Sequence, residues 1–221
     1  MHGNARRPAP FLFALPVVEY YQSKTPEEDL ILKWLEHLRT VQHHRFLVLR
    51  HCWRVGLYRQ GLTHDLSKFS PVEFWTGARY YQGNRSPNAA EREDKGYSEA
   101  WMHHKGRNRH HYEYWTDMNR ETKCYEPVPM PRRYFVEMVM DRRAACMTYQ
   151  GKAYRDDSAL QYFERSREKD LMHPETSRQL RFILGMLAEK GEAETFSYLR
   201  RTVLKGKPFP WEEAQDSLMR K

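Results

Sequence analysis

Histidine and aspartate are the side chains of this sequence whose types and spacing could do chemistry. Eleven of the 221 residues are histidine, and several stand beside one another or beside an aspartate. Imidazole is the commonest metal ligand in proteins and the side chain best suited to proton transfer near neutral pH. The candidates, in chain order, are His44, the pair His64-Asp65, His104, the pair His110-His111, and Asp141.

Mixed nitrogen and oxygen donors suit first-row divalent metals, namely Mn, Fe, Co, Ni or Zn. An adjacent His-Asp pair is useful in such a site, because the carboxylate can bridge two ions while the imidazole holds one. The sequence therefore predicts a site for one or two divalent transition-metal ions. A thiolate-bound structural zinc is not expected, because the candidate ligands are nitrogen and oxygen donors.

Two of the ligand positions have alternatives. His51 follows His44 by seven residues, or two helical turns, so either histidine could supply the first ligand. His104 and His111 are also seven residues apart and would share one face of a continuous helix. A helix break at Gly106 would cancel that register and let His110 replace or join His111.

The segments that carry these residues have helical periodicity. Two helix starts are well marked, because Thr25 and Ser70 each precede a proline and are followed three residues later by a glutamate. We expect surface loops at 83–96 and 116–130. The expected helices begin at Thr25 (with a second stretch over about 41–59), at Ser70 and near Ser98, and cover about 132–150, 157–169, 174–190 and 192–204, with a short one after Pro210.

Strand alternation and tight hairpin signals are missing from the sequence, so we expect an all-α protein. The expected organisation is an irregular N-terminal arm over residues 1–24, a metal-binding helical domain over 25–156, and a helical extension over 157–221 that packs on the same core. Gly56 and Gly61 are candidate helix terminators.

Composition excludes some classes of protein. The absence of a run of about 18 apolar residues argues against a membrane-spanning helix, and sparse, odd-numbered cysteines favour a reducing, cytoplasmic location. Lysine and arginine number 37 against 29 acidic residues, a net charge of +8. This charge is compatible with phosphorylated small molecules or nucleic acid, although nucleic acid is not favoured because the basic residues are spread along the chain. The oligomeric state is not indicated.

The motifs resemble those of known proteins. His44, His64-Asp65 and Asp141 resemble the H…HD…D signature of the HD-domain metal-dependent phosphohydrolases, and Lys68 matches the HDxxK form of that motif. More closely, the chain resembles an uncharacterised family of bacterial and phage proteins, a domain of unknown function, through the strings HDLSKFS at 64–70 and HxxxNxHHxEYW at 104–115. That resemblance covers about residues 30–180. The HD resemblance implies an HD-like helical bundle.

The HD resemblance also implies roles. In a two-ion site, His44, His64, Asp65 and Asp141 would hold one ion, and His104 with His110 or His111 the second, with Asp65 bridging. Lys68 would neutralise charge on phosphoryl oxygens, Glu113 would orient a ligand histidine, and Arg107, Arg109 or Arg142 would bind substrate phosphate.

The function implied is a divalent-metal-dependent phosphohydrolase acting on a nucleotide or another phosphate ester. An alternative is a di-iron oxygenase, because some HD-like proteins with extra histidines have that activity. A third is a non-catalytic, metal-stabilised module that binds nucleic acid or a partner protein through its basic surface. Salt-dependent affinity for nucleic acid would be the mark of the third.

Overall fold

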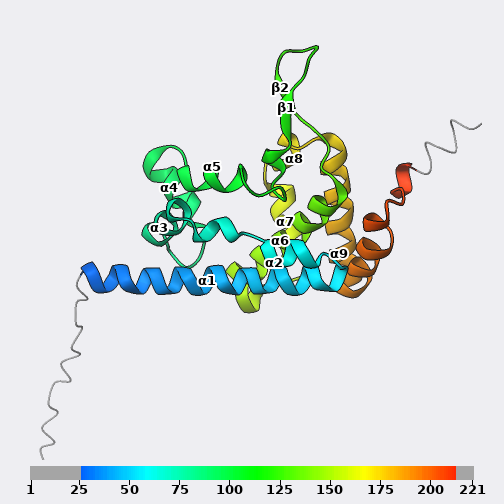
Figure 1. Ribbon diagram of the computed structural model, residues 1–221. Helices are drawn as coiled ribbons and strands as arrows, with labels where there is room; N and C mark the ends of the chain where they lie inside the picture. The colour runs from blue at the N-terminus through cyan, green and yellow to red at the C-terminus, as the bar shows by residue number, and fades with distance from the viewer. Residues whose placement is uncertain (1–25, 213–221) are drawn as a thin grey trace, which may run out of the picture.

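A long N-terminal helix forms one side of the molecule. The computed structural model describes residues 26–212, and its first element, α1 (Pro26–Val55), runs without a break along the bottom of Figure 1. The prediction of two separate helices here is wrong, since no glycine or proline interrupts residues 27–55. Gly56 ends the helix at a φ of 91°, as its expected role as a terminator requires.

The chain then folds back on α1. Helix α2 (Tyr58–Thr63) contains Gly61 in its interior, so the expected role of Gly61 as a terminator is wrong. Its small size serves packing instead, because a Cβ atom at this position would lie 3.0 Å from the Cβ atom of Cys52 in α1. The close contact between α1 and α2 fixes the position of the His64-Asp65 pair that follows.

Three helices and a short helical turn form the left-hand part of Figure 1. They are η1 (Leu66–Phe69), α3 (Pro71–Arg79), α4 (Pro87–Lys95) and α5 (Glu99–Lys105). The predicted start at Ser70 is confirmed, because its hydroxyl accepts a hydrogen bond from the backbone N–H of Glu73 at 3.4 Å. Residues 83–96 are not only a loop: they contain α4, with Pro87 at its start and Gly96, at a φ of 82°, at its end.

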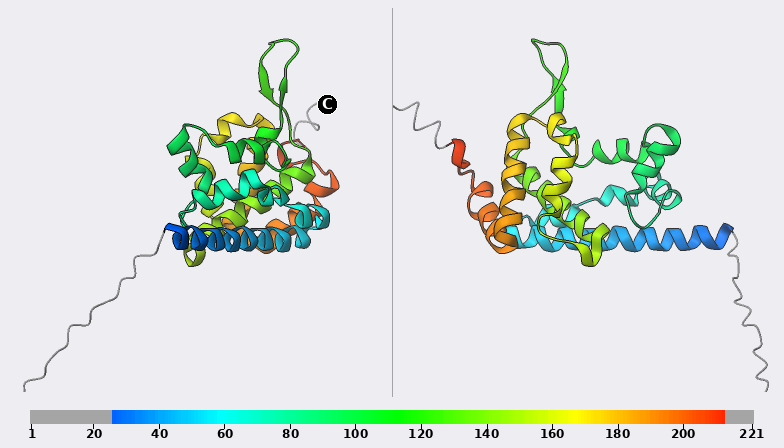
Figure 2. Two further views of the ribbon diagram at one scale, coloured as in Figure 1. Left: turned by 60° about the vertical axis from the view of Figure 1, so that its left-hand side comes forward. Right: turned by 180° about the vertical axis from the view of Figure 1, so that it is seen from behind.

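A short hairpin projects away from the body on the side opposite α1 (Figures 1 and 2). Strands β1 (Thr116–Met118) and β2 (Tyr125–Pro127) pair antiparallel, preceded by η2 (Tyr112–Tyr114). The sequence predicts a loop without strands over 116–130. The structure instead forms β1 and β2 within this segment, and these are the strands of the described residues. The all-α assignment is nevertheless confirmed, because helices dominate the structure.

The remaining elements complete the bundle. They are α6 (Arg132–Gln150), η3 (Gly151–Ala153), α7 (Ser158–Arg165), α8 (Glu168–Leu171), α9 (Pro174–Arg201) and η4 (Val203–Lys205). Helix α6 matches its predicted range. The single helix expected over 157–169 is divided into α7 and α8. The two expected after 174 are joined in α9, where Gly191 (φ 73°, ψ −177°) makes a kink.

The apolar core lies between α1, α6, α7 and α9. Val48 of α1, Phe135 of α6, Phe163 of α7 and Leu184 of α9 are fully buried in it. Helix α9 therefore shares a core with the helices that carry the histidines. The domain boundaries themselves remain a prediction, and the expected arm over 1–24 and residues 213–221 of the extension lie outside the described residues.

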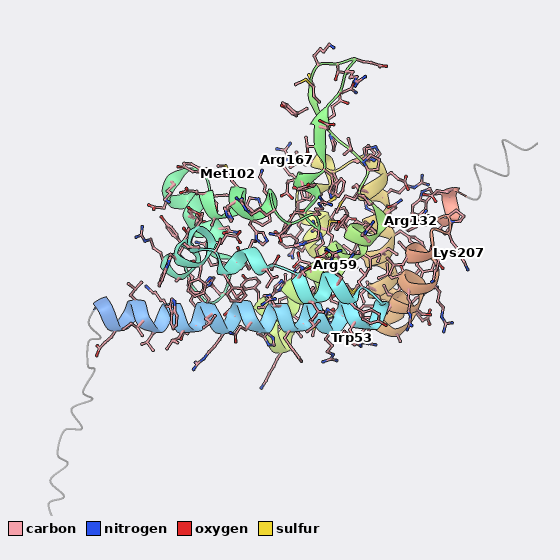
Figure 3. The ribbon with its side chains drawn as sticks, viewed as in Figure 1. Trp53, Arg59, Met102, Arg132, Arg167 and Lys207 are labelled. Atoms are coloured by element: carbon pink, nitrogen blue, oxygen red, sulfur yellow. The ribbon has the colours of Figure 1, made fainter. Side chains whose placement is uncertain are left out.

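Exposed side chains mark the outer surfaces. Trp53, which is 57% exposed, lies on the side of α1 turned away from the body, and Met102 lies on the outer side of α5 (Figure 3). His104, two residues after Met102, is buried. Among the described helices, none has the length and apolar character needed to cross a lipid bilayer.

Candidate metal centre

All seven residues predicted to bind metal lie in two neighbouring groups. His44 comes from α1, His64 and Asp65 from the link between α2 and η1, His104 from α5, and Asp141 from α6. His110 and His111 come from the irregular segment before η2. Within each group, one candidate ligand atom from every member lies within 4.8 Å of the others.

The first group consists of His44, His64, Asp65 and Asp141. Nε2 of His44 lies 3.0 Å from Oδ1 of Asp141 and 3.8 Å from Oδ2 of Asp65. Nε2 of His64 lies 3.5 Å from each of the same two oxygens. Two imidazoles and two carboxylates therefore direct their donor atoms toward one small region.

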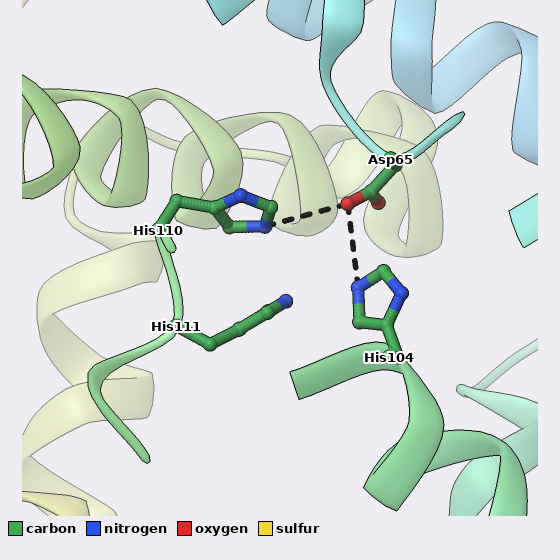
Figure 4. Close-up of side chains that lie close together, drawn as sticks. All are labelled: Asp65, His104, His110 and His111. Carbon is green, nitrogen blue, oxygen red and sulfur yellow. Dashed lines mark ion pairs between the residues drawn. The ribbon is translucent and has the colours of Figure 1, made fainter. Parts of the chain in front are cut away.

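The second group consists of Asp65, His104, His110 and His111. The Nε2 atoms of His104 and His110 each lie 3.3 Å from Oδ1 of Asp65 (Figure 4). The ring of His111 points into the space between the other two rings. Asp65 is thus shared: its Oδ2 atom faces the first group and its Oδ1 atom faces the second.

Five of the candidate ligand atoms lack hydrogen-bond partners. Nε2 of His44, His64, His110 and His111 and Oδ1 of Asp65 are buried, and none has a contact with hydrogen-bond geometry among the described residues. Even the 3.0 Å contact of His44 with Asp141 lacks that geometry. Buried polar atoms are normally paired, so unpaired atoms that converge need another partner. Imidazole nitrogens and carboxylate oxygens are suitable ligands for the divalent metals expected from the sequence.

Asp65 has an unusual backbone conformation. Its φ of 53° and ψ of 27° place it in the left-handed region, which aspartate tolerates better than most residues. The turn between α2 and η1 therefore reverses at this residue. This local reversal directs its carboxylate toward both groups.

Helix α5 ends after His104 and before His110 and His111, so the register of His104 and His111 on one continuous helical face is wrong. The break occurs at Gly106, the alternative left open by the sequence. A turn follows in which the side-chain amide of Asn108 donates to the backbone oxygen of His104 and to Oγ of Ser67, each at 2.8 Å. This turn brings both His110 and His111 to the site.

Glu137, which the sequence analysis did not assign to the site, connects the two groups. Nδ1 of His64 lies 3.1 Å from Oε1 of Glu137, and Nδ1 of His110 lies 3.3 Å from the same oxygen. Each Nδ1–H can donate to this carboxylate, which leaves Nε2 free to act as a ligand. The sequence feature that could have indicated Glu137 is its spacing. It precedes Asp141 by one helical turn and so shares the same face of α6.

Glu73 orients His104, another ligand of the second group, in the same way. Its Oε2 atom lies 2.7 Å from Nδ1 of His104, and its Oε1 atom lies 2.6 Å from Nδ1 of His103. The sequence indicated Glu73 only as part of the helix start at Ser70. Carboxylates thus orient three ligand histidines.

Among the described residues, Glu113 makes no hydrogen bond to a candidate ligand histidine, and its orienting role stays a prediction. Its Oε2 atom is buried without a hydrogen-bond partner, and the charges around it are those of Glu168, Arg142 and Lys105. Burial raises the pKa of this carboxyl group, and Glu168 adds to the effect. Glu137 and Glu73 contact the ligand histidines instead.

The predicted cationic residues are divided between the site and the surface. Nζ of Lys68 lies 2.8 Å from Oδ2 of Asp65. Arg142 lines the cavity beside the two groups but is paired with Glu168 at 2.6 Å. Arg107 and Arg109 are exposed, and neither lines that cavity. Arg107 donates a hydrogen bond to the backbone oxygen of His103, and Arg109 donates one to the hydroxyl of Tyr134.

The structure separates His51 from the ligand groups. Its Nε2 atom accepts a hydrogen bond from Nη1 of Arg143 at 2.6 Å, and its ring contacts Phe196 of α9. Burial and the nearby guanidinium lower the pKa of His51 to about 4. His44 is therefore the α1 histidine that lies with the candidate ligands.

The electrostatics of the two groups favour bound cations. Burial opposes ionisation of Asp65, but His64, Lys68 and His104 outweigh it and hold the pKa of its carboxyl group well below the usual range. Burial alone would lower the pKa of His110, whereas the nearby carboxylates of Asp65 and Glu137 raise it to about 10. Both shifts reflect anionic carboxylates that attract positive charge.

Comparison with known proteins identifies a family but no activity. No curated protein and no solved structure matches the chain. The model of a family of unknown function, DUF5662, matches residues 33–186, a range that contains every residue of both ligand groups. The chain therefore belongs to the family of unknown function DUF5662.

Proposed function

We propose that the protein is a divalent-metal-dependent phosphohydrolase of the HD type, with a centre for two ions. The observation that carries this proposal is the position of Asp65, whose two carboxylate oxygens face separate groups of histidines. His44, His64 and Asp141 would complete one group, and His104, His110 and His111 the other. Mn, Fe, Co, Ni and Zn all suit such donors.

The phosphohydrolase assignment rests on the kind of site together with the charges around it. Divalent ions held close together polarise a phosphoryl oxygen and lower the pKa of water, which is the chemistry that hydrolysis of a phosphate ester needs. Lys68 lines the same cavity as the ligand groups and can donate to a phosphoryl oxygen while contacting Asp65. Glu137 and Glu73 keep the imidazoles of His64, His110 and His104 in the ligand tautomer.

Metal analysis combined with an activity assay tests the proposal. Protein purified without chelator should contain one to two equivalents of a transition metal, and Asp65→Asn should lose most of it while keeping its fold. Asp117→Asn, in the exposed strand β1, is the matched control and should keep its metal. The metal-loaded protein should release phosphate from p-nitrophenyl phosphate, and Asp65→Asn should not.

Three results would contradict the proposal. Wild-type protein that stays metal-free after incubation with Mn and Fe would contradict the proposal of a metal centre. A metal-loaded protein inactive toward every phosphate ester would remove the hydrolase assignment. Oxygen consumption by the iron-loaded protein, without phosphate release, would assign the site to an oxygenase.

A further inference from the structure

The cavity beside the ligand groups is much larger than a phosphoryl group. Its volume is about 670 Å³, within the range of pockets that enclose a small organic ligand. His44, Asp65, His104 and Asp141 form part of its wall. Another part of the wall is formed by residues 84–89 and Arg92, from the segment between Gly83 and Gly96. A substrate could therefore place a phosphoryl group at the ligand groups and its organic portion against this segment.

Most cations that line the cavity already have an acidic partner. Lys68 lies 2.8 Å from Asp65, and Arg142 lies 2.6 Å from Glu168. Arg85 makes two parallel contacts of 2.6 Å with the carboxylate of Glu93. Arg92 is the one lining cation for which the described part of the chain shows no ion pair; it lies over the ring of Trp101 at 5.6 Å.

The rest of the lining away from the ligand groups is rich in neutral polar and aromatic side chains. Asn84, Ser86 and Asn88 offer amide and hydroxyl groups from the segment before and within α4. Trp101, Tyr149 and Tyr162 offer aromatic surface from α5, α6 and α7. Groups of this kind recognise an uncharged polar or aromatic molecule. They do not compensate the extra negative charges of a polyphosphate chain.

We propose that the cavity accepts esters with a single phosphoryl group on an uncharged organic portion and discriminates against di- and triphosphates. The Arg85–Glu93 pair contributes to this specificity, because Glu93 occupies the guanidinium face that a second phosphate would need. The inference rests on the proposed function. In the reaction, the oxygen of water bonds to phosphorus, the ester P–O bond breaks and the leaving alcohol takes up a proton. One ester and one water thus give one alcohol and one inorganic phosphate.

The kinetic test compares AMP, ADP and ATP with the full-length, Mn-loaded protein. We expect kcat/KM for AMP to exceed the values for ADP and ATP by at least about 10-fold. The added phosphates of ADP and ATP would lose their hydrogen bonds to water without gaining a charge-assisted hydrogen bond in the cavity. Glu93→Gln frees Arg85 and should raise kcat/KM for ADP and ATP by about 2- to 5-fold, the range of an exposed ion pair. The value for AMP should remain within 2-fold.

A binding measurement gives a readout that does not depend on turnover. In calorimetry, Glu93→Gln should increase affinity for methylenediphosphonate, a non-hydrolysable diphosphate, by about 2- to 5-fold. Its affinity for inorganic phosphate should not change. Glu164→Gln is the matched control, because Glu164 pairs with Arg181 through two similar contacts and does not line the cavity. It should alter neither affinity.

The outcomes separate this inference from the proposed function. Equal rates with AMP and ATP, or a Glu93→Gln variant with wild-type diphosphonate affinity, would overturn the specificity while leaving the phosphohydrolase intact. Release of phosphate from none of the three nucleotides and from no simpler ester would overturn the function and this inference together.

Discussion

Replacing Glu137 with alanine removes one carboxylate that contacts a histidine of each ligand group. His64 and His110 would each keep a buried Nδ1–H without an acceptor, at 3.1 and 3.3 Å from the oxygen that is lost. An unsatisfied buried donor costs about 1–3 kcal/mol, so the metal-free variant should be about 2 kcal/mol or more less stable. Loss of such an outer partner weakens metal binding by about 10- to 100-fold for each histidine concerned.

Because His64 and His110 belong to different groups, Glu137→Ala should lower the affinity of the protein for both ions. Glu73→Ala makes the contrast, since Glu73 contacts only one candidate ligand, His104 of the second group. Calorimetric titration of Mn into metal-free protein should show two weakened steps for Glu137→Ala and one for Glu73→Ala.

A control variant separates these effects from general destabilisation. Glu192→Ala removes a carboxylate that lies 2.8 Å from the buried Arg143 and contacts no candidate ligand. It should lower the unfolding free energy and leave metal affinity unchanged. Wild-type affinity for both ions in Glu137→Ala, or the same pattern in Glu137→Ala and Glu73→Ala, would refute the reasoning.

Three further predictions concern stability. Gly77→Ala should lower the unfolding free energy measured in urea by about 1–3 kcal/mol, because the new Cβ would lie 2.4 Å from Nε2 of His37, which is too close for a Cβ atom. As a control, Gly185→Ala on α9 places its Cβ in open space and should be neutral or stabilising. Between pH 6.5 and about 4 the unfolded chain takes up a proton that folded His51 refuses, so stability should fall by up to about 3 kcal/mol as the pH is lowered through this window. His51→Gln, which can still accept from Arg143, should show a shallower fall, and an equal slope would contradict the assignment. Mn at 100 times its dissociation constant should raise the unfolding free energy by about 2.7 kcal/mol, and a chelator should reverse this; an unchanged melting temperature would mean that the folded protein has no preferred metal site.

The parts of the fold that the sequence could predict depend on local interactions. Ser70, Pro71 and Glu73 are adjacent in the chain, and the helix start that they form is present. Gly56 ends α1 because its backbone conformation is intrinsically available to glycine. The kink at Gly191 arises in the same way, although the helix continues beyond it.

The parts that the sequence could not predict depend on tertiary contacts. Nothing local indicates that the oxygen of Glu137 reaches His64, 73 residues earlier in the chain. Helix α4 was missed because its sequence is strongly polar, and it exists with only one small stretch of buried residues, Ala90 and Glu91. The convergence of the seven candidate ligands was expected from motif resemblance, whereas the break at Gly106 that delivers two of them was one of two alternatives that the sequence left open.

The uninterrupted course of α1 determines where the chain can change in length. His37, His44 and His51 are buried on this helix at intervals of seven residues, about 10 Å apart, and meet the cavity, the ligand groups and Arg143 respectively. Deleting one residue between two of these histidines would rotate one relative to the other by about 100°. Insertions and deletions should therefore be rejected between His37 and His51. The exposed tip of the β1–β2 hairpin, which contacts no candidate ligand, is the place where they should be tolerated.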